Sequence, residues 1–252
     1  MDLLLSKIVS SILQIILFAI IPFIWWFITA RKKQSFPQWI GLKKMKWNKK
    51  VFIASFMVTV AFMFLGMLTL YMLKDVEIAT SEFAGLGLPA IPAIVIYATF
   101  NTALPEEILF RGFLLKRIQN KFGFGVANVV QALIFGFVHG VMFWGVVGVV
   151  KALIVIIFTG VVAWLMGYIN EKKCEGSIIP SWIIHTISNI FSGIFPCTLS
   201  IYNCSIAVLY FAISFIKISI CFCNSIVSSF PLASVTLQIN LKLVTSVECS
   251  AS

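Results

Sequence analysis

Apolar segments of about 20 residues recur along this chain, and each is long enough to cross a bilayer as a helix. The chain has 252 residues, of which 60% are hydrophobic and 11% are charged. Soluble domains carry roughly 25% charged residues, so this composition excludes an ordinary soluble protein. We predict an all-α fold, a polytopic transmembrane bundle of about six to eight membrane helices in one integral membrane domain.

The basic residues, which give a net charge of +10, gather at the ends of the apolar segments. The loop 31–50 alone carries eight Lys or Arg residues and no acidic residue. This is the pattern of cytoplasmic loops, and it argues against a nucleic-acid partner. We therefore expect a multi-pass protein of the cell (plasma) membrane, surrounded by membrane lipid. The expected spans are about 4–29, 51–73, 89–121, 124–143, 146–168 and 178–195, with a seventh apolar segment at 199–222.

One short stretch, Pro105–Gly112, places two carboxylates and a guanidinium inside this apolar sequence. Ionisable groups at membrane depth are costly and usually functional. The two histidines of the chain lie in two later stretches, Phe135–His139 and His185–Asn189. These three stretches are the candidate functional site.

Helical rise places the three stretches at a similar depth. Glu106 lies about 15 Å from the basic end of its segment, and His139 lies about 22 Å along its span. His185 and Asn189 lie about 10–17 Å along theirs. We expect a site in the cytoplasmic half to the middle of the bilayer.

Residues four apart share a helix face, so Glu107 faces Arg111 and Phe135 faces His139. We interpret Glu107 and Arg111 as an internal ion pair that braces its helix, and Glu107, Arg111 and Phe135 as supporting residues. Glu106 points about 100° away from Glu107 and has no local partner. It is therefore left to face the rest of the bundle.

The predicted catalytic residues are Glu106, His139, His185 and Asn189. Two mechanisms are compatible with them. Glu106, His139 and His185 could bind a metal such as Zn²⁺, with one position left for water. Without a metal, Glu106 and His139 could deprotonate a water molecule, while His185 and Asn189 donate hydrogen bonds to an oxyanion. Both predict a hydrolase that attacks with water inside a membrane bundle.

The motifs Glu-Glu-x-x-x-Arg, Phe-x-x-x-His and His-x-x-x-Asn, in this order on membrane helices, resemble the CAAX-protease and bacteriocin-processing (Abi) family of intramembrane proteases. The resemblance covers about residues 89–196. It implies an endopeptidase, usually classed as a metallopeptidase, that cleaves a membrane-associated protein or peptide reached from the membrane or the cytoplasmic side. It implies that Glu106 and His139 activate water and that His185 and Asn189 stabilise the oxyanion. Bacterial relatives often act in bacteriocin maturation or self-immunity.

Two other classes of protein were weighed. A catalytically silent relative, serving as an immunity or scaffold protein that binds a peptide, would share every motif. A small proton-coupled carrier predicts symmetric repeats with paired broken helices, and the sequence shows none. Residues 197–252 are rich in serine and cysteine and form an atypical tail, for which we hypothesise a divergent or frame-shifted origin.

Overall fold

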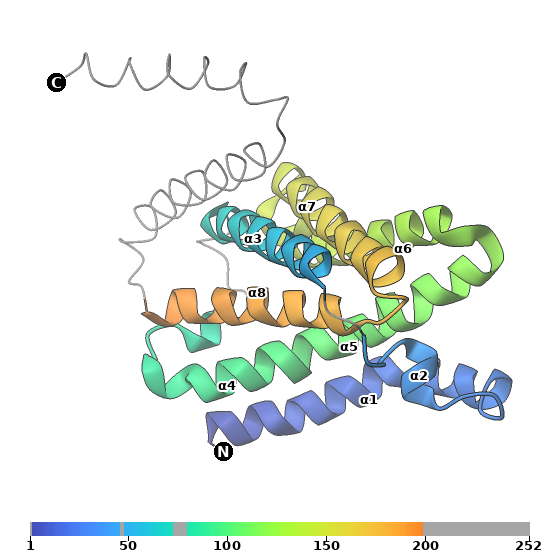
Figure 1. Cartoon of the computed structure of the whole chain (residues 1–252). Helices are drawn as coiled ribbons and strands as arrows, with labels where there is room; N and C mark the ends of the chain where they lie inside the picture. Colours follow the sequence, from blue (N-terminus) through green and yellow to red (C-terminus); the bar gives the residue numbers. More distant parts are fainter. Residues whose placement is uncertain (1, 46–47, 73–79, 199–252) are drawn as a thin grey trace, which may run out of the picture. The chain divides into compact units, whose positions relative to one another are not determined.

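The computed structural model describes residues 2–45, 48–72 and 80–198, and every regular element in these ranges is helical (Figure 1). The all-α prediction is therefore confirmed for this part of the chain. The predicted seventh segment at 199–222 and most of the atypical tail lie outside the described residues. The longer helices are α1 (Leu3–Thr29), α3 (Lys49–Met72), α6 (Lys116–Val147), α7 (Val149–Tyr168) and α8 (Ile179–Thr198). The shorter elements are α2 (Phe36–Ile40), η1 (Ser81–Phe83), η2 (Leu88–Ala90), α4 (Ile91–Ile96), η3 (Tyr97–Ala103), α5 (Leu104–Glu106), η4 (Glu107–Leu115) and η5 (Ile169–Lys173).

Three helical stretches of the described chain are long and apolar enough to cross a membrane, namely Leu3–Thr29, Leu88–Val147 and Val149–Lys173. The middle stretch is interrupted at Gly123, whose φ of 78° and ψ of 167° are not helical. Two helical segments therefore meet at Gly123, next to Phe124, where a new span was predicted to begin. The other predicted spans correspond to α3 and α8, and the number of six to eight membrane helices stays a prediction.

The backbone around Pro105 is helical on both sides but wider than an α-helix. The segments η3 and η4, which flank α5, are both π-helical. Proline lacks an N–H and its ring crowds the carbonyl four residues before it, and a wider turn relieves both problems. The helix therefore continues through Pro105, which neither ends it nor starts a new one.

The basic segments predicted to share one side of the membrane do lie at one end of the bundle. The Ile178 amide donates to the Gly41 carbonyl at 2.9 Å, and the Ser177 hydroxyl donates to the Lys43 carbonyl at 2.8 Å. Lys116 Nζ donates to the Gly176 carbonyl at 2.7 Å. These bonds join three segments that are distant in sequence, and they fix where α8 begins.

Apolar side chains cover much of the outside, as on α1, where Leu13, Leu17 and Ile28 are exposed. Polar side chains such as Asn128 and Gln131 are instead fully buried. Asn128 Nδ2 donates to the Trp164 carbonyl, 2.9 Å away, across the contact between α6 and α7. A bundle that is apolar outside and hydrogen-bonded inside suits a lipid surrounding.

Close approach of α6 and α7 depends on glycines at their contact. A Cβ on Gly136 would collide with the backbone of Ile156, and a Cβ on Gly140 would collide with the Ile156 side chain. Gly160 on α7 faces the same contact, where its added Cβ would lie 3.3 Å from the Ala132 carbonyl oxygen. Gly136 and Gly140 therefore form a small-xxx-small pair that allows close helix packing.

Gly136→Ala is expected to destabilise the protein by about 1–3 kcal/mol, because the new methyl group must push α7 away. The measurement is the thermal unfolding midpoint of the purified protein in one detergent. Gly145→Ala on the same helix is the matched control, since its added Cβ meets nothing within 4 Å. Equal midpoints for the two variants would contradict the packing role.

Candidate active site

Glu107 lies at the centre of the polar cluster and is fully buried, as is Arg111 one turn later. Glu107 Oε1 lies 3.0 Å from Arg111 Nη1. The N–H bonds of Arg111 are not aligned for hydrogen bonding, so the contact is an ion pair rather than a bidentate fork. Phe135 lies against the guanidinium, with its ring centre 4.4 Å from Cζ. The predicted pairing of Glu107 with Arg111 is observed, and Phe135 lies beside it.

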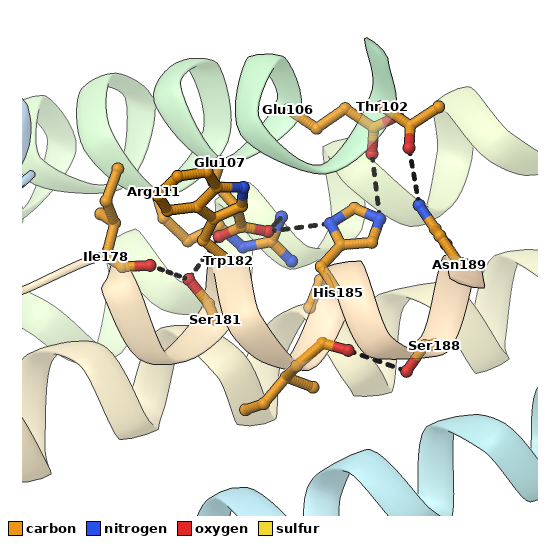
Figure 2. A network of polar contacts seen from close by, with 12 residues as sticks. Thr102, Glu106, Glu107, Arg111, Ile178, Ser181, Trp182, His185, Ser188 and Asn189 are labelled. Atoms are coloured by element: carbon orange, nitrogen blue, oxygen red, sulfur yellow. Dashed lines mark hydrogen bonds and ion pairs between the residues drawn. The ribbon is translucent and has the colours of Figure 1, made fainter. Parts of the chain in front are cut away.

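Glu107 also contacts α8, which the sequence analysis did not anticipate. Its Oε1 lies 3.1 Å from His185 Nδ1, and its Oε2 accepts a hydrogen bond from the Ser181 hydroxyl at 2.5 Å (Figure 2). The i, i+4 rule identifies Arg111 as a partner on the same helix, but it cannot identify partners on another helix. Glu107 therefore links its own helix to α8, in addition to its ion pair with Arg111 on the same helix.

Glu106 points toward both histidines of the chain. Its Oε2 lies 3.7 Å from His185 Nε2 and 4.0 Å from His139 Nε2. Both distances exceed a hydrogen bond, and this buried oxygen has no hydrogen-bond partner among the described residues. The three side chains that were predicted to meet across the bundle do meet, with Nε2 of each ring directed at one carboxylate oxygen.

The Nδ1 atoms of both rings are already engaged. His139 Nδ1 lies 2.8 Å from the Phe135 carbonyl oxygen, which can only accept a hydrogen bond. His185 Nδ1 faces the carboxylate of Glu107 in the same way. A neutral ring in either position therefore carries its proton on Nδ1 and presents a free lone pair at Nε2.

Asn189 lies one turn after His185 on α8, as predicted, but its amide is held elsewhere. Its Nδ2 donates to Thr102 Oγ1 at 2.8 Å, and Thr102 in turn donates to the Ala98 carbonyl at 3.1 Å (Figure 2). An amide nitrogen has two N–H bonds, so one remains for another acceptor. Asn189 thus lies at the edge of the cluster formed by Glu106, His139 and His185.

Ser181, Asn170 and Thr102 also contact the predicted site residues or their partners, and the sequence did not predict these contacts. Ser181 precedes His185 by four residues, so polar residues at helical spacing on α8 were a usable signal. Asn170 lies on η5 among charged residues and offered no such signal. Its contacts depend on where η5 meets α8.

The donor types suit a metal, although the observed spacing is wide. Two imidazoles with engaged Nδ1 atoms and free Nε2 atoms beside a carboxylate are typical of zinc ligands. Ligands at about 2.0–2.2 Å from one tetrahedral ion lie closer together than 3.7 and 4.0 Å. As placed, no group of three or more His, Cys, Asp or Glu residues in the described ranges could hold a metal ion. Holding an ion would need small side-chain movements of Glu106 and His139.

Apolar membrane-type helices around a buried centre of carboxylates and imidazoles are typical of a helical membrane protein with a buried polar cluster. Residues 88–191 match the family described as type II CAAX prenyl endopeptidase Rce1-like. The match spans all three motifs and confirms the resemblance drawn from them. No curated protein and no solved structure matches the chain.

Proposed function

We propose that this protein is an intramembrane endopeptidase that hydrolyses a peptide bond of a membrane-associated protein or peptide. The observation that carries the proposal is the carboxylate of Glu106, which lies opposite two free imidazole nitrogens. Its side chain and that of His139 are 19% and 26% exposed, whereas Glu107 behind them is fully buried. Water and a substrate carbonyl can therefore approach the exposed parts of Glu106 and His139, although Glu106 Oε2 itself is buried, whereas the Glu107 side chain has no exposed part.

In the proposed reaction, a water molecule binds between Glu106 and His139. Glu106 takes a proton from this water as its oxygen attacks the peptide carbonyl carbon, and His139 orients it. The same proton then passes from Glu106 to the leaving amine. His185, when protonated, keeps its Nδ1–H on Glu107 and donates Nε2–H to the oxyanion, and Asn189 offers its second N–H.

A metal-assisted version of this mechanism would use the same residues. Glu106, His139 and His185 would hold the ion, and zinc would supply a water of lowered pKa at this position. Elemental analysis of the purified protein separates the two forms. Stoichiometric zinc in wild type that is lost in His139→Gln supports the metal-assisted form, whereas full activity in metal-free protein rejects it.

Cleavage products of membrane peptides are expected in membranes that contain the wild-type protein and are expected to be absent from membranes that contain Glu106→Gln. The measurement is comparative mass spectrometry of peptide termini from membranes that contain either protein. Glu175→Gln, which alters an exposed carboxylate in the loop before α8, is the control and should match wild type. Identical termini in all three samples would instead favour a silent immunity or scaffold protein that binds a peptide without cutting it.

A further inference from the structure

Behind Glu107 lies a pair of buried polar side chains for which the proposed reaction has no use. Ser181 on α8 is fully buried, and Asn170 on η5 is 1% exposed. Ser181 Oγ lies 2.5 Å from Glu107 Oε2, and Asn170 Nδ2 lies 2.7 Å from Ser181 Oγ. Asn170 Oδ1 also accepts the backbone N–H of Ser181 at 3.3 Å. The two residues therefore form one chain of hydrogen bonds that ends on the carboxylate.

The direction of this chain follows from its donors. Asn170 Nδ2 can only donate, so Ser181 Oγ accepts from it and keeps its own hydrogen for another partner. The carboxylate of Glu107 accepts that hydrogen, although the Ile178 carbonyl at 3.0 Å is also within reach. A bond to an ionised carboxylate is the stronger of the two.

The two oxygens of Glu107 are thereby held from opposite sides. Oε2 is fixed by Ser181, so Oε1 is directed at Arg111 and at His185 Nδ1 (Figure 2). The orientation of Oε1 determines which ring nitrogen of His185 carries the proton and where Nε2 points. Nε2 in turn lies 3.7 Å from Glu106. The Ser181 hydroxyl, which reaches His185 only through Glu107, can therefore control the direction and protonation of His185 Nε2.

We propose that Ser181, held by Asn170, is a positioning residue that acts through Glu107 to keep His185 protonated on Nδ1 with Nε2 facing Glu106. The catalytic consequence rests on the proposed function, whereas the state of the ring does not. Ser188 shows what a purely structural serine on the same helix looks like. It is 3% exposed and donates to the Ile184 carbonyl at 2.9 Å, four residues earlier on its own helix.

The first test uses ¹⁵N-histidine NMR of the full-length protein in lipid. The chain has two histidines, so His139→Gln assigns the signals of both. We expect the neutral form of wild-type His185 to show a protonated Nδ1 and a bare Nε2, and the charged form that donates to the oxyanion to keep its proton on Nδ1. Ser181→Ala should shift the His185 nitrogens toward a mixture of tautomers, whereas Ser188→Ala should leave them unchanged. Ser181→Thr keeps the hydroxyl and should restore the wild-type signals.

Wild-type His185 signals in Ser181→Ala would overturn the proposal. If that variant does not accumulate, Ser181→Cys carries the same test, because a thiol of similar shape donates only weakly. Equal shifts in Ser188→Ala and Ser181→Ala would also overturn it, because they would report general loosening of α8.

The second test is kinetic and uses a peptide cut by wild type. Ser181→Ala should lower kcat roughly tenfold with KM unchanged, as expected when one bond to a charged group is lost. In Glu107→Gln, adding Ser181→Ala should cost nothing further, because the serine acts through that carboxylate. Additive losses would overturn the proposal. If wild type cuts no peptide, the proposed function fails while the NMR result still decides the state of His185.

Discussion

Replacing Glu106 by glutamine is expected to abolish peptide cleavage while the protein stays folded. Glutamine keeps the shape of the side chain but cannot take a proton from water. Loss of a general base lowers the rate by about 10²–10⁴-fold, and the effect should fall on kcat rather than on KM. The fold should survive because Glu106 Oε2 has no hydrogen-bond partner in the described part of the chain, so no structural bond is lost.

The measurement is the cleavage rate of an identified peptide by purified wild type and variant in one lipid mixture, together with their unfolding midpoints. His139→Gln should cause a loss of the same kind, because its Nε2 faces the same oxygen of Glu106. Glu175→Gln serves again as the exposed control. Cleavage by Glu106→Gln at the wild-type rate would show that Glu106 is not the general base. The proposed mechanism would then be wrong, although the match to the endopeptidase family would remain.

The sequence was sufficient for those features that depend on one segment at a time. Apolar length predicted the helices, and the basic loops predicted which helix ends lie together. The spacing of Glu107 and Arg111 predicted their contact. Each follows from the apolar length, the charge or the helical periodicity of a single segment and needs no knowledge of how two helices are rotated against each other.

The common depth of the three motifs predicted that Glu106, His139 and His185 would meet, but the further contacts that depend on the rotation of one helix against another could not be predicted. Glu106 and Glu107 were expected to have separate roles because adjacent side chains diverge. They do diverge, yet both approach the same ring, Glu106 at Nε2 and Glu107 at Nδ1 of His185. The π-helical turns on either side of Glu106 alter the angles that an ideal α-helix implies. The contact of Ser181 with Glu107 further depends on the loop bonds that fix where α8 begins.

Arg111→Met is expected to destabilise the protein more than any change to Glu106 or His139. Methionine keeps an apolar stem against Phe135 but removes the positive charge beside Glu107. A buried carboxylate left without its partner costs about 3–5 kcal/mol. The measurements are the amount of protein in the membrane and the unfolding midpoint after purification in one detergent.

The double variant Glu107→Gln/Arg111→Met separates loss of the pair from loss of the arginine itself. Removing both charges leaves no unpaired ion, and replacing a whole buried pair by neutral groups is often harmless to stability. The double variant should therefore be more stable than Arg111→Met alone, yet poorly active, because His185 Nδ1 would no longer face a carboxylate. An Arg111→Met protein that accumulates and unfolds like wild type would show that Ser181 and His185 alone hold the charge of Glu107. Recovery of both stability and activity in the double variant would instead show that the reaction does not need a carboxylate at this position.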